Sequence, residues 1–295
     1  MWRTAILAAA NSPRIQRFVQ RYGMRLGAGR FVPGETLDEA VVALRALNDK
    51  GLYANTTILG ESVRDAGEAS AVADEYVRLL ERLSAEALKV NVALKLTHLG
   101  LELDEELAYA NVARVVDAAR RLDNFIRIDM EQSTVVDATL RIYRRLRADG
   151  FDNVGCVLQA YLYRAPDDLE ALLPLTPNLR IVKGAYLEPA EIAYPKKEDV
   201  DAAYMRLVER AVEGGAYVAV ATHDERMIEH GIAHGANEFQ MLYGIRPQLQ
   251  VTLAQRGFKV LVATPYGPEW YPYLMRRLAE RPANLLFFAR NALRR

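Results

Sequence analysis

The stretch YVAVATHDERMIEHGIAHGANEFQML at residues 217–242 contains two apolar runs, YVAVAT and NEFQML, with a helical pattern over 225–234 between them. The first run is apolar at almost every position instead of alternating between apolar and polar residues. Such a run is typical of a strand buried on both faces, as the strands of parallel sheets are. The order of strand, helix and strand therefore predicts two parallel strands joined by a crossover helix.

This unit repeats along the chain. Eight apolar runs are found: NTTILG (55–60), VNVALKL (90–96), NFIRIDM (124–130), NVGCVLQ (153–159), LRIVKG (179–184), YVAVAT (217–222), NEFQML (237–242) and FKVLVAT (258–264). Helical patterns lie between them, over 69–88, 103–122, 134–148, 200–213, 225–234 and 246–256. Eight strands that alternate with helices predict an α/β fold, a parallel (β/α)8 barrel of the TIM type.

An open, doubly wound sheet is the alternative arrangement of parallel strands and helices. It requires a glycine-rich phosphate-binding turn directly after an early strand. The nearest match is GAGRFV at 27–32, which follows a helical pattern and has Val32 in the place of the third glycine. The barrel is therefore the favoured fold.

Length and composition fit one barrel with an extension. The chain has 295 residues, about 45 more than a typical barrel needs, so we assign 1–50 to an N-terminal helical extension and 51–295 to the barrel catalytic domain. The chain has 51% hydrophobic and 26% charged residues, as is ordinary for a globular protein. This composition excludes a disordered, a collagen-like or a coiled-coil chain. The 38 basic and 38 acidic residues balance, so no net charge indicates a nucleic-acid partner.

The single cysteine, Cys156, cannot form an internal disulfide, which suits a reducing compartment such as the cytoplasm. It lies within the apolar run at 153–159, where we expect it to pack as a small apolar side chain. No run approaches the ~18 consecutive apolar residues that a membrane span requires.

Both ends of the chain are basic. Residues 1–34 carry six arginines and no acid, and residues 276–295 carry six arginines and one glutamate. Four arginines recur at helical spacing, namely Arg14, Arg17, Arg21 and Arg25. They predict an amphipathic helix that either lies on an anionic membrane surface or packs on the edge of the domain with its charges in solvent. The apolar segment TAILAAA (4–10) leaves a signal peptide as a third interpretation.

Polar and charged residues stand where the predicted strands end. They are Glu61, Lys95, Asp129, Gln159, Lys183, Thr222 and His223. Active sites of this fold lie at the carboxyl ends of the strands, and acids and bases around one rim can pair with each other. The sequence therefore predicts an active site at this end of the barrel.

One pair of histidines has the spacing of a helical metal site. His230 and His234 are four residues apart, but the sequence offers no obvious third ligand, and Gly231 stands where the zincin pattern has its glutamate directly after the first histidine. We expect a solvated helix face there and no metal site.

Several segments resemble the proline dehydrogenase family, both the monofunctional bacterial enzymes and the dehydrogenase domain of the bifunctional proline utilisation proteins. The resemblance runs in order from about residue 55 to 290, with one motif at each strand end. The motifs are LGES (59–62), ALKLTHLG (93–100), RIDMEQS (127–133), LQAYLYR (158–164), LRIVKGAYLEP (179–189), ATHD (221–224) and YPYLMRRLAERPANLLFF (271–288).

The resemblance implies a distorted barrel that binds FAD and oxidises L-proline to Δ1-pyrroline-5-carboxylate, by hydride transfer from C5 to the flavin N5. It also implies a membrane quinone as electron acceptor, a cytoplasmic enzyme held peripherally on the inner face of the cell membrane, and a downstream pyrroline-5-carboxylate dehydrogenase as partner. The cofactor-binding positions that it implies are Met130, Gln159, Arg180, Lys183, Gly184, Ala185, Thr222 and His223.

For the substrate, the resemblance implies a carboxylate clamp made by Lys95, Arg276 and Arg277. Guanidinium groups suit this task because their forked donors bind two carboxylate oxygens. Asp129 and Arg180 match catalytic positions, and Asp129 is expected to pair with Lys95. Glu61 is expected to close the site by pairing with Arg276. The predicted walls around the pyrrolidine ring are Tyr186, Leu242, Ala263 and Tyr273.

Ala263 is the one clear departure from the family, which commonly has a tyrosine at this point of the last strand motif. The space left by the missing ring predicts relatively better use of 4-hydroxyproline, unless Tyr266 or Tyr271 fills the gap. Two other functions stay open: a Schiff-base aldolase that uses Lys183 or Lys95 as nucleophile, and a non-catalytic binding module.

Overall fold

The computed structural model describes residues 12–26 and 28–280 of the chain. Its centre is a closed barrel of eight parallel strands in sequence order, in which β8 pairs with β1. The strands are β1 (Tyr53–Ile58), β2 (Val90–Leu94), β3 (Ile126–Ile128), β4 (Val154–Gln159), β5 (Asn178–Val182), β6 (Tyr217–Ala221), β7 (Glu238–Leu242) and β8 (Val260–Tyr266). The predicted (β/α)8 barrel is confirmed, with one strand inside or overlapping each predicted run.

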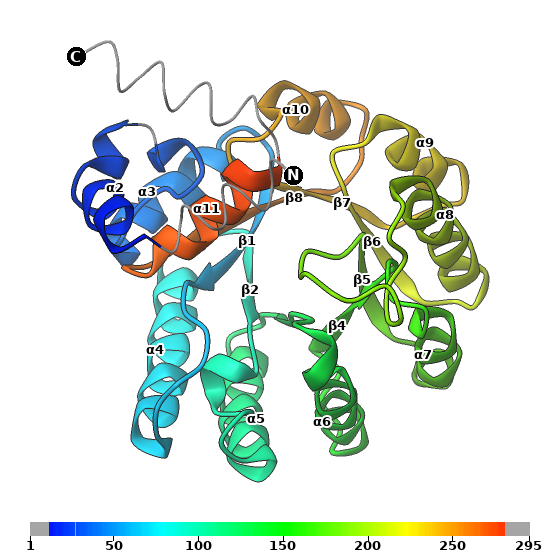
Figure 1. Ribbon diagram of the computed structural model, residues 1–295, viewed down its shortest axis with the longest axis horizontal. Helices are drawn as coiled ribbons and strands as arrows, with labels where there is room; N and C mark the ends of the chain where they lie inside the picture. The colour runs from blue at the N-terminus through cyan, green and yellow to red at the C-terminus, as the bar shows by residue number, and fades with distance from the viewer. Residues whose placement is uncertain (1–11, 27, 281–295) are drawn as a thin grey trace.

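Helices surround the barrel on its outside (Figure 1). They are α4 (Ala66–Ala85), α5 (Glu105–Arg121), α6 (Val136–Ala148), α7 (Ala165–Leu172), α8 (Lys197–Glu213), α9 (Glu225–Ala233) and α10 (Pro247–Gln255). The last helix, α11 (Trp270–Glu280), follows β8 and lies at the barrel mouth instead. Local signals start some of them, since the carboxylates of Asp65 and Asp104 cap α4 and α5 by accepting hydrogen bonds from backbone amides. The periodicity misses α7 because eight residues make little more than two turns.

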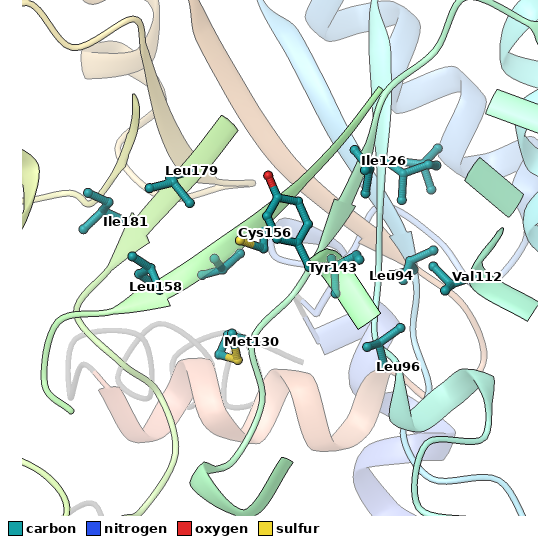
Figure 2. Close-up of a cluster of buried hydrophobic side chains, with 14 of the residues drawn as sticks. Leu94, Leu96, Val112, Ile126, Met130, Tyr143, Cys156, Leu158, Leu179 and Ile181 are labelled. Atoms are coloured by element: carbon teal, nitrogen blue, oxygen red, sulfur yellow. The ribbon is translucent and has the colours of Figure 1, made fainter. Parts of the chain in front are cut away.

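The outward faces of the strands and the inward faces of the helices form the main core. Figure 2 shows one part of it, where Cys156 of β4 lies among side chains that include Tyr143, Leu158 and Met130. Cys156 is fully buried, as expected for a packing residue, and burial raises the pKa of its thiol to about 12. The thiol is therefore held in its unreactive form.

Two helices precede the barrel, α2 (Pro13–Leu26) and α3 (Leu37–Asn48). Thr36 and Glu39 start α3 with a capping box, in which each side chain binds the other residue's backbone amide. The helix α2 lies beside α11 (Figure 1), and a second apolar cluster joins this region to the barrel mouth. That cluster is Ala28, Phe31, Val32, Leu59, Ile245, Trp270, Tyr271, Leu274 and Met275, with Leu242 and Tyr273 packed against it.

The predicted basic helix is α2, which packs at the edge of the domain with Arg17 and Arg21 exposed on it, and a membrane contact through this exposed face stays a prediction. The side chains of Arg14 and Arg25 and the segment TAILAAA (4–10) lie outside the described residues, as do residues 281–295. Among the helices that the structure describes, none has both the length and the apolar character needed to cross a membrane.

Candidate active site

A cavity of about 520 Å³ lies at the carboxyl ends of the strands. Fourteen of the predicted site residues line it: Lys95, Asp129, Met130, Gln159, Arg180, Lys183, Gly184, Ala185, Tyr186, Thr222, His223, Leu242, Ala263 and Tyr273. They come from seven strands, β2 to β8, or the loops that follow them, and from α11, so the barrel brings together residues that are far apart in the chain. Arg276 and Arg277 also belong to α11, but their side chains lie outside the part of the chain that the structure describes.

Arg180 of β5 organises the buried side of the cavity. Its Nη1 donates to Asp129 Oδ1 at 2.6 Å, and its Nη2 donates to Asn55 Oδ1 at 2.7 Å. Its Nε is buried and has no hydrogen-bond partner among the described residues. A buried donor without an acceptor is costly, so this N–H fits a site that a polar ligand completes.

Lys95, which follows β2, is held by Glu61, which follows β1. The Lys95 Nζ lies 2.9 Å from Glu61 Oε1. The expected pair of Lys95 with Asp129 is wrong, because Asp129 pairs with the guanidinium of Arg180 instead. The expected contact of Glu61 with Arg276 stays a prediction, since the Arg276 side chain is outside the described residues.

Lys183 lies in a cluster of charges at the other side of the cavity. Its Nζ is 2.6 Å from Asp201 Oδ1 of α8 and 3.5 Å from Asp224 Oδ2. Asp201 also pairs with Lys197 and Arg226. Burial alone would raise the pKa of Asp201, but hydrogen bonds from Lys183 and Lys197 lower it below its ordinary value. The cluster therefore places three cations around ionised carboxylates at the cavity edge.

Gly184 follows β5 with a φ of +120°, a conformation that side chains rarely adopt. A Cβ atom there would lie 2.2 Å from the ring of Tyr161. Only glycine fits this position, and its bare backbone borders the cavity. Such a surface lets a flat or phosphorylated group approach the main chain closely.

Two further predicted residues are oriented by backbone groups. The amide nitrogen of Gln159 donates to the Glu131 carbonyl at 2.8 Å, which leaves the amide oxygen for another partner. The Leu242 amide donates to His223 Nε2 at 3.0 Å, so this ring nitrogen is the acceptor and ties the end of β6 to the end of β7.

Ala263 of β8 lies opposite Asn55 of β1 and lines the cavity. Neither Tyr266 nor Tyr271 is among the cavity-lining residues. Tyr266 is buried in the main core, and Tyr271 belongs to the cluster around α11. The space beside Ala263 is therefore not filled by Tyr266 or by Tyr271.

Sequence reasoning misses several residues of the site. Asn55 and Gln240 line the cavity from β1 and β7, and Asp201 and Asp224 hold Lys183. A usable signal for both Asn55 and Gln240 is an amide side chain within a predicted strand, because a barrel interior must give a buried polar group a partner. Asp201 carries no such signal, because on a helix an aspartate reads as an ordinary surface residue.

Glu131 is also missed. It is almost fully buried and accepts hydrogen bonds from the Thr97 amide at 3.1 Å and from the Thr97 hydroxyl at 2.5 Å. Burial raises the pKa of Glu131 to about 7, although the hydrogen bonds from Thr97 oppose the shift. Glu131 follows Met130 of the cavity wall and ties that loop to the loop after β2.

Comparison with known proteins gives one consistent family. The family model described as Proline dehydrogenase matches residues 40–290. The chain is 41% identical over its whole length to the whole of Proline dehydrogenase 1 of Bacillus subtilis. It is 42% identical to the Proline dehydrogenase of Deinococcus radiodurans, with all of this chain and 98% of that protein covered. It is 27% identical to the bifunctional protein PutA of Escherichia coli, of which it covers 26%.

Solved structures give the same result. A crystal structure of proline utilization A from Bdellovibrio bacteriovorus, described as inactivated by N-propargylglycine, superposes with a TM-score of 0.81 at 25% identity. The match covers 89% of this chain and 33% of that protein, so the chain spans about a third of its length. The family model, the full-length identity and the eight-stranded barrel agree, and the chain therefore belongs to the proline dehydrogenase family.

Proposed function

We propose that this proline dehydrogenase uses FAD to oxidise L-proline to Δ1-pyrroline-5-carboxylate and passes the electrons to a membrane quinone. The observation that carries the proposal is the arrangement around Arg180. A buried guanidinium, held by Asp129 and Asn55, leaves its Nε–H without a partner among the described residues of the cavity wall. A donor in this position stabilises negative charge on a bound ligand.

The residues present fit a flavin nucleotide. The cavity has room for a large planar group, and Gly184 provides a bare backbone surface where any side chain would meet Tyr161. The cations around Lys183, with Thr222 and His223 at the end of the neighbouring strand β6, suit the phosphates of the nucleotide. Met130 and Gln159 complete the set that would contact the ring system. When bound, FAD supplies a two-electron acceptor for the hydride that leaves C5 of proline.

The chain's own residues bind and orient the substrate. The ammonium of Lys95, fixed by Glu61, would bind the proline carboxylate together with Arg276 and Arg277. Tyr186, Leu242 and Tyr273 would enclose the pyrrolidine ring and exclude water. The double bond of the product forms as the substrate nitrogen gives up its proton and C5 gives up its hydride. Catalysis is then mostly orientation and electrostatic stabilisation, because no residue needs to form a covalent bond.

The Schiff-base alternative has little support in this geometry. A lysine nucleophile must be a neutral amine. Lys95 and Lys183, the two candidates, are each paired with a carboxylate, at 2.9 Å from Glu61 and 2.6 Å from Asp201. Both amines are therefore already held by carboxylates, an arrangement that positions them to bind anions and not to attack a carbonyl.

The first test is the visible spectrum of the purified protein, followed by an assay of proline oxidation with a soluble quinone. Flavin absorption bands and reduction of the quinone by L-proline are expected. A colourless protein that stays inactive after FAD is added would overturn the proposal. Borohydride treatment with a keto substrate tests the aldolase alternative, since it traps only a Schiff base.

A membrane quinone gives the enzyme a reason to bind the cytoplasmic face of the membrane, and a pyrroline-5-carboxylate dehydrogenase is the partner that would consume its product. We propose that the basic ends of the chain make this contact, and Arg17 and Arg21 are exposed on α2. At about 1 kcal/mol for each well-placed basic residue, a few would suffice at low salt. Co-sedimentation with anionic vesicles should exceed that with neutral vesicles and should fall at high salt. Equal binding to both kinds of vesicle contradicts the electrostatic account.

A further inference from the structure

The structure places a carboxylate beside the histidine pair for which the sequence offers no third ligand. His230 lies near the end of α9, His234 directly follows that helix, and Glu209 lies near the end of α8. One nitrogen of each ring and one oxygen of Glu209 lie within 4.8 Å of one another. The two helices lie side by side on the outside of the barrel (Figure 1).

The hydrogen bonds of the two rings decide which nitrogens are available. A backbone carbonyl can only accept, so the ring nitrogen that faces it must carry the hydrogen. His230 Nε2 therefore donates to the Met205 carbonyl at 3.1 Å, and His234 Nδ1 donates to the His230 carbonyl at 2.9 Å. In the neutral rings, the lone pairs are then on His230 Nδ1 and His234 Nε2. This arrangement, with one ring nitrogen fixed by a backbone carbonyl, is the one that orients histidine ligands in metal sites.

The free ring nitrogen of His234 faces the carboxylate of Glu209. The Nε2 atom of His234 lies 3.6 Å from Glu209 Oε1. With Nδ1 donating to a backbone carbonyl, Nε2 and the carboxylate oxygen can both bind one cation placed between them. A tetrahedral ion with bonds of ~2.0–2.1 Å separates its ligand atoms by roughly 3.3 Å, close to the distance already present.

We propose that Glu209, His230 and His234 form a binding site for a zinc-type divalent cation that joins α8 to α9. Two imidazoles and one carboxylate are a ligand set that zinc accepts, with water in the fourth position. All three side chains are partly exposed, so an ion can reach them and small rotations can close the site. The site lies at the carboxyl ends of its helices, which in this fold is the end of the barrel opposite to the catalytic cavity. Its role is structural, because it links two neighbouring units of the barrel.

The test is titration of the chelator-treated full-length protein with zinc chloride, followed by calorimetry. One zinc ion should bind, and Glu209→Gln, His230→Ala and His234→Ala should each weaken that binding at least about tenfold. The matched control is Glu213→Gln, which removes the same charge from an exposed position one turn further along α8 and should leave binding unchanged.

Thermal unfolding gives a second readout that separates the site from the catalytic cavity. Zinc should raise the Tm of the wild-type protein and of Glu213→Gln but not that of His234→Ala, because only a bound ion stabilises the folded state. Without zinc, the Tm of each variant shows whether it folds. Absence of zinc binding in the wild-type protein, or equal binding in the wild type and all three ligand variants, would overturn the proposal.

Discussion

Two buried arginines inside the same barrel have different surroundings. Arg127 of β3 donates from Nη1 to the carbonyls of Cys156 and Asn178, at 2.9 and 2.7 Å, and packs on the ring of Phe125. Arg180 of β5 donates to the side chains of Asp129 and Asn55 and has a buried Nε without a partner among the described residues. Backbone carbonyls, the side-chain oxygen of Asn178 and an aromatic ring satisfy the first guanidinium, whereas the second borders a cavity and has a donor to offer.

The difference separates a structural charge from a functional one. Burial, together with the nearby charge of Arg180, lowers the pKa of Arg127 to about 10, which still leaves it charged at neutral pH. Its charge is balanced by carbonyl dipoles and by the field of Glu238. Arg180 has its own carboxylate, Asp129, and its remaining donor is positioned for a ligand. Burial alone does not identify a site residue; an unsatisfied donor beside a cavity does.

Replacing each arginine by methionine tests this comparison most directly and should have the largest effects. Arg180→Met should lower kcat/KM for proline by about 10²–10³, because a preorganised donor beside the reacting group is lost. Arg127→Met should leave kcat/KM of the folded protein within a few-fold but lower the free energy of unfolding by about 2–4 kcal/mol, since two buried carbonyls lose their donor. Steady-state kinetics measure kcat/KM, and urea unfolding measures the free energy of unfolding of each variant. If Arg127→Met lost activity and Arg180→Met lost only stability, the functional role of Arg180 and the structural role of Arg127 would be contradicted.

Glu131→Gln should change how stability depends on pH. The raised pKa of Glu131, about 7 against 4.5 in the unfolded chain, means that the folded state favours the protonated carboxyl. The resulting stabilisation is fully present below pH 4.5 and is lost as the pH rises through 7. At 1.36 kcal/mol per unit, the difference of 2.5 units is worth at most about 3 kcal/mol. The free energy of unfolding of the glutamine variant should therefore rise relative to that of the wild type between pH 5 and pH 8. Urea unfolding at pH 5 and at pH 8 measures this change. If the two proteins differ by the same free energy at both pH values, the raised pKa of Glu131 is contradicted.

Gly184→Ala tests whether the glycine surface shapes the cofactor site. The added methyl group meets the ring of Tyr161, and the φ of +120° is strained for alanine. We expect a loss of flavin affinity of roughly 10–100-fold, equivalent to about 1–3 kcal/mol of strain. The control is Gly215→Ala, which has a φ of +79° but no neighbour within 4 Å of the added atom. The flavin-to-protein ratio should fall in the first variant alone, and an equal fall in both would show that backbone strain, not the cavity, is responsible.

Ala263→Tyr should have the smallest effect, and it tests the substrate side of the cavity. Neither Tyr266 nor Tyr271 lines the cavity beside Ala263. A restored ring should lower the ratio of kcat/KM for 4-hydroxyproline to that for proline by roughly tenfold, the discrimination that one pocket wall provides. Kinetics with both substrates measure the ratio in the variant and the wild type. If the ratio stays the same, Ala263 does not shape the pocket.

The sequence alone determined the fold and the end of the barrel at which the site lies. Apolar runs such as YVAVAT indicate parallel strands whose two faces are both buried. Eight such runs, alternating with helices, favour a closed barrel. Strand-end residues such as Asp129 and Lys183 then had to meet at one rim. Their order along the chain was sufficient for this, since parallel strands end at the same edge.

Only the tertiary structure decided which side chains pair. Asp129 binds Arg180 and not Lys95, and Glu209 lies beside His234, although no sequence pattern links either pair. The partners lie on different strands or helices, and the tilt of each strand and the rotamer of each side chain set the distance between them. The periodicity of a sequence reports which face of an element is buried, whereas pairing across the barrel depends on the packing of all the elements together.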